Sequence, residues 1–481
     1  MKFINVALLL IVSNVSNLLA QTPSATLNTF ITKIDDTYQF EEKDNNFFFV
    51  MTNSHIEAHK TDASFNVVST IAEDFDAKRK LLVGHTTDTN LNPTLYWLER
   101  NGKELTSISY DFNTKSKPII NNLVLNLKDE NIVTSFGADD IFYVITSLKN
   151  TNSLRIIEYN SQLEQLSESQ IDLDRNKFYD NEDNLTTLHQ AFQGLESTKG
   201  PLNILKIREE LPSAIPIASA KRKIYIRNKA VYITLDNSDR RTVLLFIDLK
   251  SKQANSTVFN QNTENKDYLS IKSNSFLIED KIAQICYTKD FINININYLS
   301  GDLIQKFRID KTQDISFLNG EIYQAVDNNL SRAKTITKTS QFLNRSYRSS
   351  MNGLSLFPSD NGYTVCYGGA TILNKNQPVY GQHGLIGALV GTAIEMAITS
   401  IAGDNLNAYG DTQTILAYSE LDKELKHNPT ATVATNKVDE IRNYIADNKI
   451  KTSYSMIFRR GEHYYLGLQR KKSTALELIQ F

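Results

Sequence analysis

Residue types that could carry chemistry are few and scattered in this chain. His55 and His59, in the sequence HIEAH, have the i, i+4 spacing that binds zinc when both lie on one helix, but the residues around them favour a strand or a turn. Asp139 and Asp140 form an acidic pair at an expected turn, where carboxylates are usually solvated. The sequence contains no Walker loop, no G-x-S-x-G motif and no cysteine pairs at metal-ligand spacing. We therefore expect a protein that is not an enzyme, with no catalytic residue, no metal site and no cofactor.

The most unusual local feature is an apolar stretch at 384–403, GLIGALVGTAIEMAITSIAG, in which Glu395 is the one charged residue. Gly387 and Gly391 form a small-xxx-small pair of the kind that permits close helix packing. The stretch could cap the fold as a helix, or form an apolar tongue that enters a partner or a membrane interface. A membrane span is disfavoured because both ends must return to one part of the fold. The large apolar side chains are the candidate partner-binding residues: Leu385, Ile386, Leu389, Val390, Ile394, Met396 and Ile398.

A run of basic residues lies close to this stretch in the sequence. Between 328 and 359 there is no acidic residue. A solvated loop is the ordinary explanation of such a run. The alternative is a basic surface that steers an acidic partner or anionic headgroups. We add its five basic residues to the candidate partner-binding residues: Arg332, Lys334, Lys338, Arg345 and Arg348.

Seven short stretches of the chain can be laid over one another. Each opens with charged or turn-forming residues, continues through a β-branched and aromatic run, and ends in a polar turn, which is typical of a β-strand between two turns. Repetition of this kind favours a solenoid or a propeller. The seven stretches are 43–54, 76–87, 139–150, 227–238, 279–290, 359–370 and 460–471.

Each repeat continues into further strands of increasing polarity. This order suits a four-stranded blade whose outer strand meets water. The seventh copy has a second and a third strand, ending in ALELIQF at Phe481, but no fourth. Residues 25–34 are an unassigned strand at the other end of the chain and are predicted to supply the missing outer strand. Residues 315–326 also have the pattern of a strand pair, which leaves an eighth blade as an alternative.

The two cysteines occupy equivalent positions in two copies of the repeat. Cys286 lies in IAQICYT and Cys366 in YTVCYGG. Equivalent positions in neighbouring blades are generally too far apart for a disulfide, whose Cα atoms must lie within about 7 Å. We expect both residues to be buried free thiols.

Three predicted insertions are longer than a turn, at 175–220, 311–350 and 371–411. The first contains an expected short helix at 184–195 and an extended, proline-containing stretch at 210–218. In an up-and-down blade, the connections from the second to the third strand and from the fourth strand to the next blade emerge on one face. All three insertions are therefore expected on the same face. Long loops in a compact fold are commonly functional.

Residues 1–20 have the pattern of a secretory signal. Lys2 gives a positive start, an apolar run extends from Val6 to Val12, and Ala20 is a small residue before an expected cleavage site. The mature part, 21–481, is expected to form a single propeller domain. Its first cysteine lies far from the expected mature N-terminus, so we expect no lipid anchor there. With 52 Lys and Arg against 54 Asp and Glu, the charge balance does not suggest a nucleic-acid partner.

These features resemble the broad β-propeller class over nearly the whole mature chain, without the Trp-Asp, kelch or Tyr-Trp-Thr-Asp signatures. The sequence SDNGYTV at 359–365 is similar to the aspartate box of sialidases, but it occurs once and lacks the terminal tryptophan of that motif. We predict an all-β fold, a seven-bladed propeller with short helical insertions on one face. Six or eight blades are the alternatives.

An exported propeller with an apolar tongue resembles the plug subunit of the type 9 secretion translocon, which closes the periplasmic end of the pore. The resemblance implies a non-enzymatic interaction module of a Gram-negative periplasm that docks on an outer-membrane protein or translocon subunit. It implies no nucleic-acid partner and no stable membrane span. The alternative is a secreted glycan-binding or glycan-active propeller, which needs clustered carboxylates or exposed aromatic residues on the insertion face.

Overall fold

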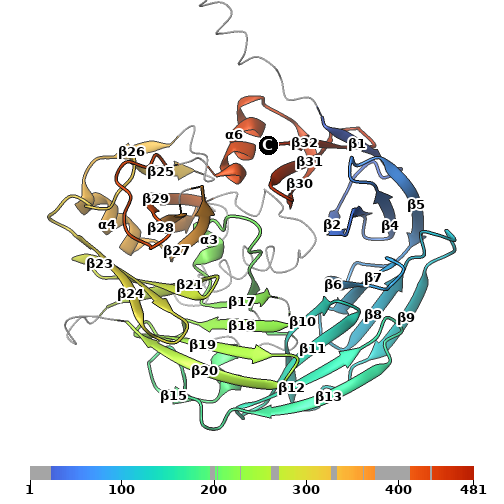
Figure 1. Ribbon diagram of the computed structural model, residues 1–481, viewed down its shortest axis with the longest axis horizontal. Helices are drawn as coiled ribbons and strands as arrows, with labels where there is room; N and C mark the ends of the chain where they lie inside the picture. Colours follow the sequence, from blue (N-terminus) through green and yellow to red (C-terminus); the bar gives the residue numbers. More distant parts are fainter. Residues whose placement is uncertain are drawn as a thin grey trace, which may run out of the picture.

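Seven sheets of four or five strands stand around a central axis as the blades of a β-propeller in the described part of the chain (Figure 1). A separate two-stranded sheet belongs to none of the blades. The computed structural model describes residues 23–194, 201–202, 204–227, 229–261, 270–326, 333–360, 362–373, 412–433 and 436–481.

The first three blades are regular and each uses four consecutive strands. Blade 1 consists of β2 (Asp36–Glu42), β3 (Asn45–Met51), β4 (His55–Thr61) and β5 (Val67–Asp74). Blade 2 consists of β6 (Lys80–Thr87), β7 (Pro93–Glu99), β8 (Glu104–Ser109) and β9 (Ile119–Val124). Blade 3 consists of β10 (Glu130–Ala138), β11 (Ile141–Leu148), β12 (Ser153–Tyr159) and β13 (Gln165–Asp172). The two-stranded sheet follows, with β14 (Phe178–Tyr179) and β15 (Leu185–Thr186).

The remaining blades carry the irregular elements. Blade 4 consists of β16 (Leu205–Lys206), β17 (Arg222–Arg227), β18 (Ala230–Leu235), β19 (Arg241–Asp248) and β20 (Gln253–Asn260). Blade 5 consists of β21 (Lys272–Ile278), β22 (Lys281–Tyr287), β23 (Phe291–Tyr298) and β24 (Leu303–Asp310). Blade 6 has the order β27 (Met351–Ser359), β28 (Gly362–Ile372), β29 (Thr412–Leu421), β25 (Ile322–Val326) and β26 (Lys334–Ile336). Blade 7 consists of β30 (Thr452–Arg460), β31 (His463–Arg470), β32 (Ala475–Gln480) and β1 (Ala25–Asn28).

Burial along the strands explains the order of polarity within a blade. In blade 1, β3 is buried at all but its first residue, whereas the outer strand β5 alternates between exposed and buried positions. A strand with neighbours on both faces has a continuous apolar run, and an outer strand with one wet face alternates. The hydrophobic core therefore lies between adjacent blades. For example, Tyr96 of blade 2 stacks on Phe142 of blade 3, with ring centroids 4.0 Å apart.

The ring closes through the two ends of the chain, as predicted. β1 pairs antiparallel with β32 as the outer strand of blade 7, and Ala25 lies opposite Leu478. The strand ends at Asn28, so it is shorter than the predicted 25–34. Ile31 and Ile34 nevertheless pack in the same apolar cluster as Leu27.

Three expectations about single elements need correction. Stretch 76–87 is the inner strand β6 of its blade, whereas the other six repeated stretches contain second strands, with blade 4 counted from β17 because the two-residue β16 is an added parallel strand. Inner and second strands are both buried on two faces, so the two have the same composition. Residues 315–326 form no extra blade, because β25 pairs with β29 inside blade 6. The stretch 210–218 is not extended throughout, since Ile215–Ala218 form the short helix α3 with a proline in its first turn.

The other helices cover insertions or blade ends. The helix predicted at 184–195 is α2 (Leu188–Gln193), which begins at a capping box between Thr187 and Gln190. α4 (Thr339–Arg348) packs on blade 6, and α6 (Lys437–Asp447) packs its buried Ile441 against blade 7. We call residues 204–218 the strap. It leaves blade 4 at β16, its Leu211 packs on blade 7, and α3 packs on blade 6.

Candidate functional site

Two of the predicted insertions leave the propeller at the same end of blade 6. Ile372, the last residue of β28, pairs with Thr412, the first residue of β29. The chain between them contains 384–403. Val326, the last residue of β25, pairs with Gln413, the next residue along β29. The chain that follows Val326 and the chain that joins β28 to β29 therefore start from neighbouring positions.

Helix α3, from the insertion 175–220, and helix α4, from the insertion 311–350, also contact this end of blade 6. Ile215 of α3 packs in one apolar cluster with Met351 and Ala370. The C-terminal turn of α4 lies beside the same strands, because a Cβ on Gly369 would come within 2.6 Å of the Ser349 side chain. All three insertions thus converge on the starts and ends of strands in one blade. We call this region the blade-6 end.

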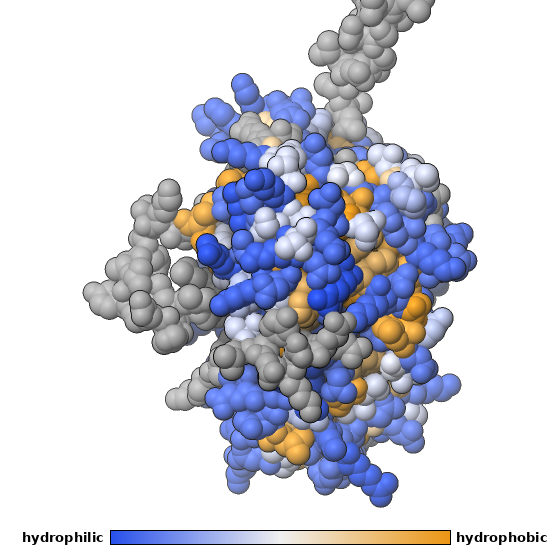
Figure 2. Space-filling view, turned by 90° about the vertical axis from the view of Figure 1, so that its left-hand side faces the viewer, coloured by the Kyte–Doolittle hydropathy of each residue, from blue (hydrophilic) through white to orange (hydrophobic). Residues whose placement is uncertain are grey.

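Four of the predicted basic residues lie on or next to β26 and α4, which border the blade-6 end, and all four are exposed. Lys334 lies on β26 and Lys338 precedes α4, while Arg345 and Arg348 lie in the last turn of α4. Arg345 donates a hydrogen bond to the Gln324 side chain. No ion pair to any of the four is present in the described part of the chain. Figure 2 shows that this side of the ring is mostly hydrophilic, with apolar side chains in small separate patches.

The remaining predicted site residues lie outside the described residues. They are Arg332, Leu385, Ile386, Leu389, Val390, Ile394, Met396 and Ile398. Among the described residues, no helix is long and apolar enough to cross a membrane.

The cysteines and the HIEAH histidines lie on strands of the blades and have the surroundings of packing residues. Cys286 and Cys366 are free and buried, as predicted, and burial raises the pKa of the Cys286 thiol to about 12. His55 and His59 lie on the strand β4, and the ring of His59 shares a hydrogen bond of 3.0 Å with Thr70. No group of three or more His, Cys, Asp or Glu side chains within the described ranges is placed to hold a metal ion.

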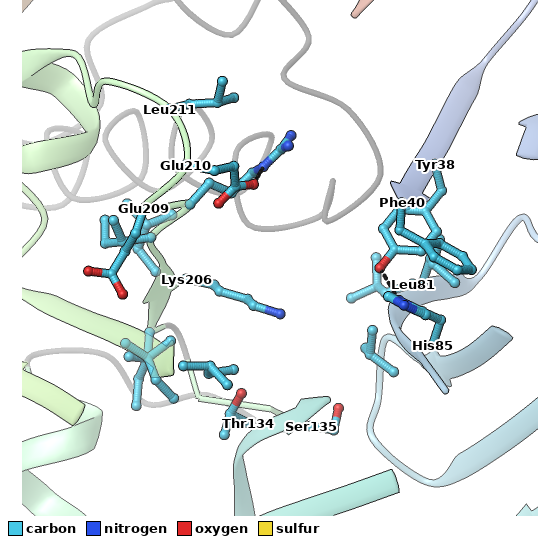
Figure 3. A pocket seen from close by; sticks show the side chains of 18 of the residues that line it. Tyr38, Phe40, Leu81, His85, Thr134, Ser135, Lys206, Glu209, Glu210 and Leu211 are labelled. Atoms are coloured by element: carbon cyan, nitrogen blue, oxygen red, sulfur yellow. Dashed lines mark hydrogen bonds and ion pairs between the residues drawn. The ribbon is translucent and has the colours of Figure 1, made fainter. Parts of the chain in front are cut away.

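A cavity of about 470 Å³ lies inside the ring of blades and was not predicted from the sequence. Its walls come from the inner strands of blades 1, 2, 3, 4 and 7 and from the strap, which brings Lys206 and Glu210 to one side (Figure 3). β6 and β10 each contain a bulge in the wall, at Val83 and Val133. Bulges re-aim side chains and are frequent beside binding sites. The volume lies within the range of small-molecule sites.

Lys206 extends from the strap into this cavity (Figure 3). Burial lowers the pKa of Lys206 to about 8, with the charge of Glu210 opposing the shift and that of Arg208 adding to it. Most of the Lys206 amine is therefore protonated at pH 7. Glu210 accepts a hydrogen bond of 2.5 Å from Arg208, so its carboxylate already has a cationic partner.

An aromatic wall faces Lys206 from blades 1 and 2 (Figure 3). Tyr38 Oη and His85 Nδ1 share a hydrogen bond of 2.7 Å, and the His85 ring stacks on Phe40 with centroids 3.6 Å apart. Burial, together with the nearby charge of Lys206, lowers the pKa of His85 to about 3. His85 is therefore neutral at physiological pH. The cavity combines apolar and aromatic walls with one ammonium group, which suits ligand binding.

The sequence matches no family model and no curated protein. Among solved structures, the chain is similar to apo AztD from Citrobacter koseri, with 13% identity and a TM-score of 0.26 over 56% of this chain and 71% of that chain. It is similar to a prolyl endopeptidase with 10% identity and a TM-score of 0.36 over 94% of this chain, but it spans only 47% of that chain. It is similar to the Dos1 propeller with 9% identity and a TM-score of 0.26, over 82% of this chain and 78% of that chain. Because these TM-scores are low, the fold assignment here depends on the strand pairing.

Proposed function

We propose that this propeller is a non-enzymatic interaction module that binds its partner through the blade-6 end. The observation that carries the proposal is the convergence of three insertions on this one region. A propeller ring offers many sites for insertions, and scattered insertions would leave no continuous surface. Insertions gathered at neighbouring strand ends supply a surface assembled from several chain segments, which is the usual way in which loops on a rigid scaffold bind partners.

The charge of the blade-6 end indicates the kind of partner. Lys334, Lys338, Arg345 and Arg348 are exposed and have no acidic counterpart within the described ranges. Isolated surface charges contribute little to affinity, but a cluster of one sign raises the rate of association with an oppositely charged surface. We infer that the partner presents acidic groups to this region.

The proposed partner is an outer-membrane protein complex on the periplasmic side. The signal pattern at 1–20 supports export, and the apolar sequence 384–403 belongs to the connection between Ile372 and Thr412, which are paired at the blade-6 end. Its large apolar residues would each contribute about 1.5–3 kcal/mol if a partner buried them. In the most specific form of the proposal, the propeller closes the periplasmic end of a protein-export channel, as the plug subunit of the type 9 translocon does.

The glycan alternative has little support in the described residues. Glycan binding by a surface needs exposed aromatic rings close together. Among the described residues, the strongly exposed aromatic side chains are Phe30, which is 88% exposed, and Tyr298, which is 46% exposed. Phe30 follows the outer strand of blade 7 and Tyr298 ends a strand of blade 5, so they form no common platform.

The test uses two variants of the blade-6 end. One replaces 384–403 with a short Gly-Ser linker. The other reverses four charges, by Lys334→Glu, Lys338→Glu, Arg345→Glu and Arg348→Glu. Each tagged protein is isolated from a mild detergent extract of the cells that produce it, and the outer-membrane proteins that accompany it are quantified by mass spectrometry. We expect both variants to melt as the unaltered protein does and to lose the same accompanying proteins.

A matched control separates the position of the charges from their number. Four exposed lysines on blades 2 and 3 or beside them form no ion pair within the described ranges, and a variant carrying glutamate at all four should keep the accompanying proteins. The four are Lys78, Lys103, Lys115 and Lys128. If the blade-6 variants fold and still bring down the same proteins, the interaction surface lies elsewhere. If the control loses them equally, net charge and not the blade-6 end is responsible.

A further inference from the structure

Among the described residues, the charged side chains that line the central cavity are paired, with one exception. Arg208 is paired with Glu210, and Glu209 accepts a hydrogen bond of 2.7 Å from Arg227. Glu41 and Arg459, at the other side of the cavity, form ion pairs with Arg460 at 3.2 Å and Glu462 at 3.3 Å. Lys206 forms no ion pair or hydrogen bond through its amine within the described part of the chain.

An ammonium group beside apolar walls is less well hydrated than one at the open surface, and it is stabilised when it gains an anionic partner. Lys206 is half-buried, and its amine has no such partner among the described residues. Leu205 and Ile207, on either side of Lys206, are both buried in the core, whereas the Lys206 side chain extends into the cavity. A cation without a partner, extending into a cavity with apolar walls, is the arrangement expected of an anion-binding site. The lowered pKa of Lys206 agrees with this arrangement.

The walls opposite Lys206 restrict the rest of the ligand. Phe40 and the neutral ring of His85 present aromatic surface, and Leu81 lies beside them (Figure 3). Thr134 and Ser135 supply hydroxyl groups on another side of the same cavity. A strongly polar or multiply charged ligand would lose hydration against these apolar walls and find one cation, Lys206, that has no ion-pair partner among the described residues. A ligand with an apolar body and one anionic group suits both features.

We propose that the central cavity binds a small carboxylate with an apolar or aromatic body, whose carboxylate pairs with Lys206 and whose body packs against Phe40, His85 and Leu81. This binding site is separate from the blade-6 end and does not depend on the function proposed for it. The strap joins the two regions, since it carries both Lys206 and α3.

The experiment uses 4-phenylbutyrate as the probe and 4-phenylbutan-1-ol as its neutral counterpart, with binding measured by isothermal titration calorimetry. Lys206→Met should weaken binding of the carboxylate by roughly tenfold or more, equivalent to about 1.4 kcal/mol. Lys206→Arg should retain most of the affinity because it keeps the charge. Binding of the alcohol should be the same for the unaltered protein and for Lys206→Met. Lys221→Met, which removes a lysine paired with Asp239, is the control and should leave both affinities unchanged.

A second measurement needs no variant and holds even if Lys206→Met fails to fold. The affinity of the unaltered protein for phenylbutyrate should fall as the pH rises through about 8, where Lys206 loses its charge, while the affinity for the alcohol should stay constant. No binding of phenylbutyrate at millimolar concentration would overturn the proposal. So would an affinity that is insensitive to both Lys206→Met and pH.

Discussion

Replacing Leu27 with alanine tests whether the pairing between the two chain ends holds the ring together. Leu27 lies on β1, is completely buried, and packs in one cluster with Phe48 of blade 1 and Leu476 of blade 7. A buried leucine replaced by alanine typically costs 2–5 kcal/mol. The total stability of a folded domain is about 5–15 kcal/mol, so one substitution at this position should remove a large fraction of it.

The neighbouring Phe30 supplies the matched control. It follows β1 by two residues but is 88% exposed, so Phe30→Ala should change the free energy of unfolding by no more than about 0.5 kcal/mol. Both variants are compared with the unaltered protein by guanidinium denaturation and by thermal melting. A lowered midpoint for Leu27→Ala with an unchanged midpoint for Phe30→Ala is the expected result. Equal midpoints for all three proteins would refute the reasoning, because β1 would then be a peripheral strand.

The other predictions concern buried ionisable groups. Burial raises the pKa of both Cys286 and Cys366, so a thiol reagent should label them slowly in the folded protein and rapidly after denaturation, as followed by mass spectrometry. Burial raises the pKa of Asp439 to about 6, so the free energy of unfolding should fall by roughly 3 kcal/mol as the pH rises from about 4 through 6, and Asp439→Asn should abolish that fall in denaturation curves. Lys223 and Asp236 form a fully buried ion pair of 2.9 Å, so Lys223→Met should cost about 3–5 kcal/mol in urea denaturation, because the Asp236 carboxylate would stay buried without its cation.

Much of the propeller follows from local patterns in the sequence. Six of the seven repeated stretches contain second strands of blades, because a strand between two neighbours needs a continuous apolar run. The closure was also predictable, since the last copy lacks an outer strand and 25–34 is a strand without a sheet. Local pattern could not distinguish β6 from a second strand, and it could not show that β25 joins blade 6 out of chain order.

Of the two candidate sites, one could be predicted from the sequence and the other could not. The basic residues of the blade-6 end were predicted because they form one run in the sequence, and the structure adds that Arg345 and Arg348 share the last turn of α4. The cavity left almost no signal, because Tyr38, His85 and Lys206 come from three different blades. The only local hint was a lysine inside the apolar run around 204–207.

The strands, their polarity and the order of the blades follow from the sequence, because each depends on residues that are neighbours in the chain. What lies on the axis depends on how distant parts of the chain fold together. The cavity exists because the blades close around a space, and Lys206 lies in it because the strap enters that space. A strap residue and the facing residues of blades 1 and 2 are separated by more than a hundred positions in the chain, and no local pattern relates them.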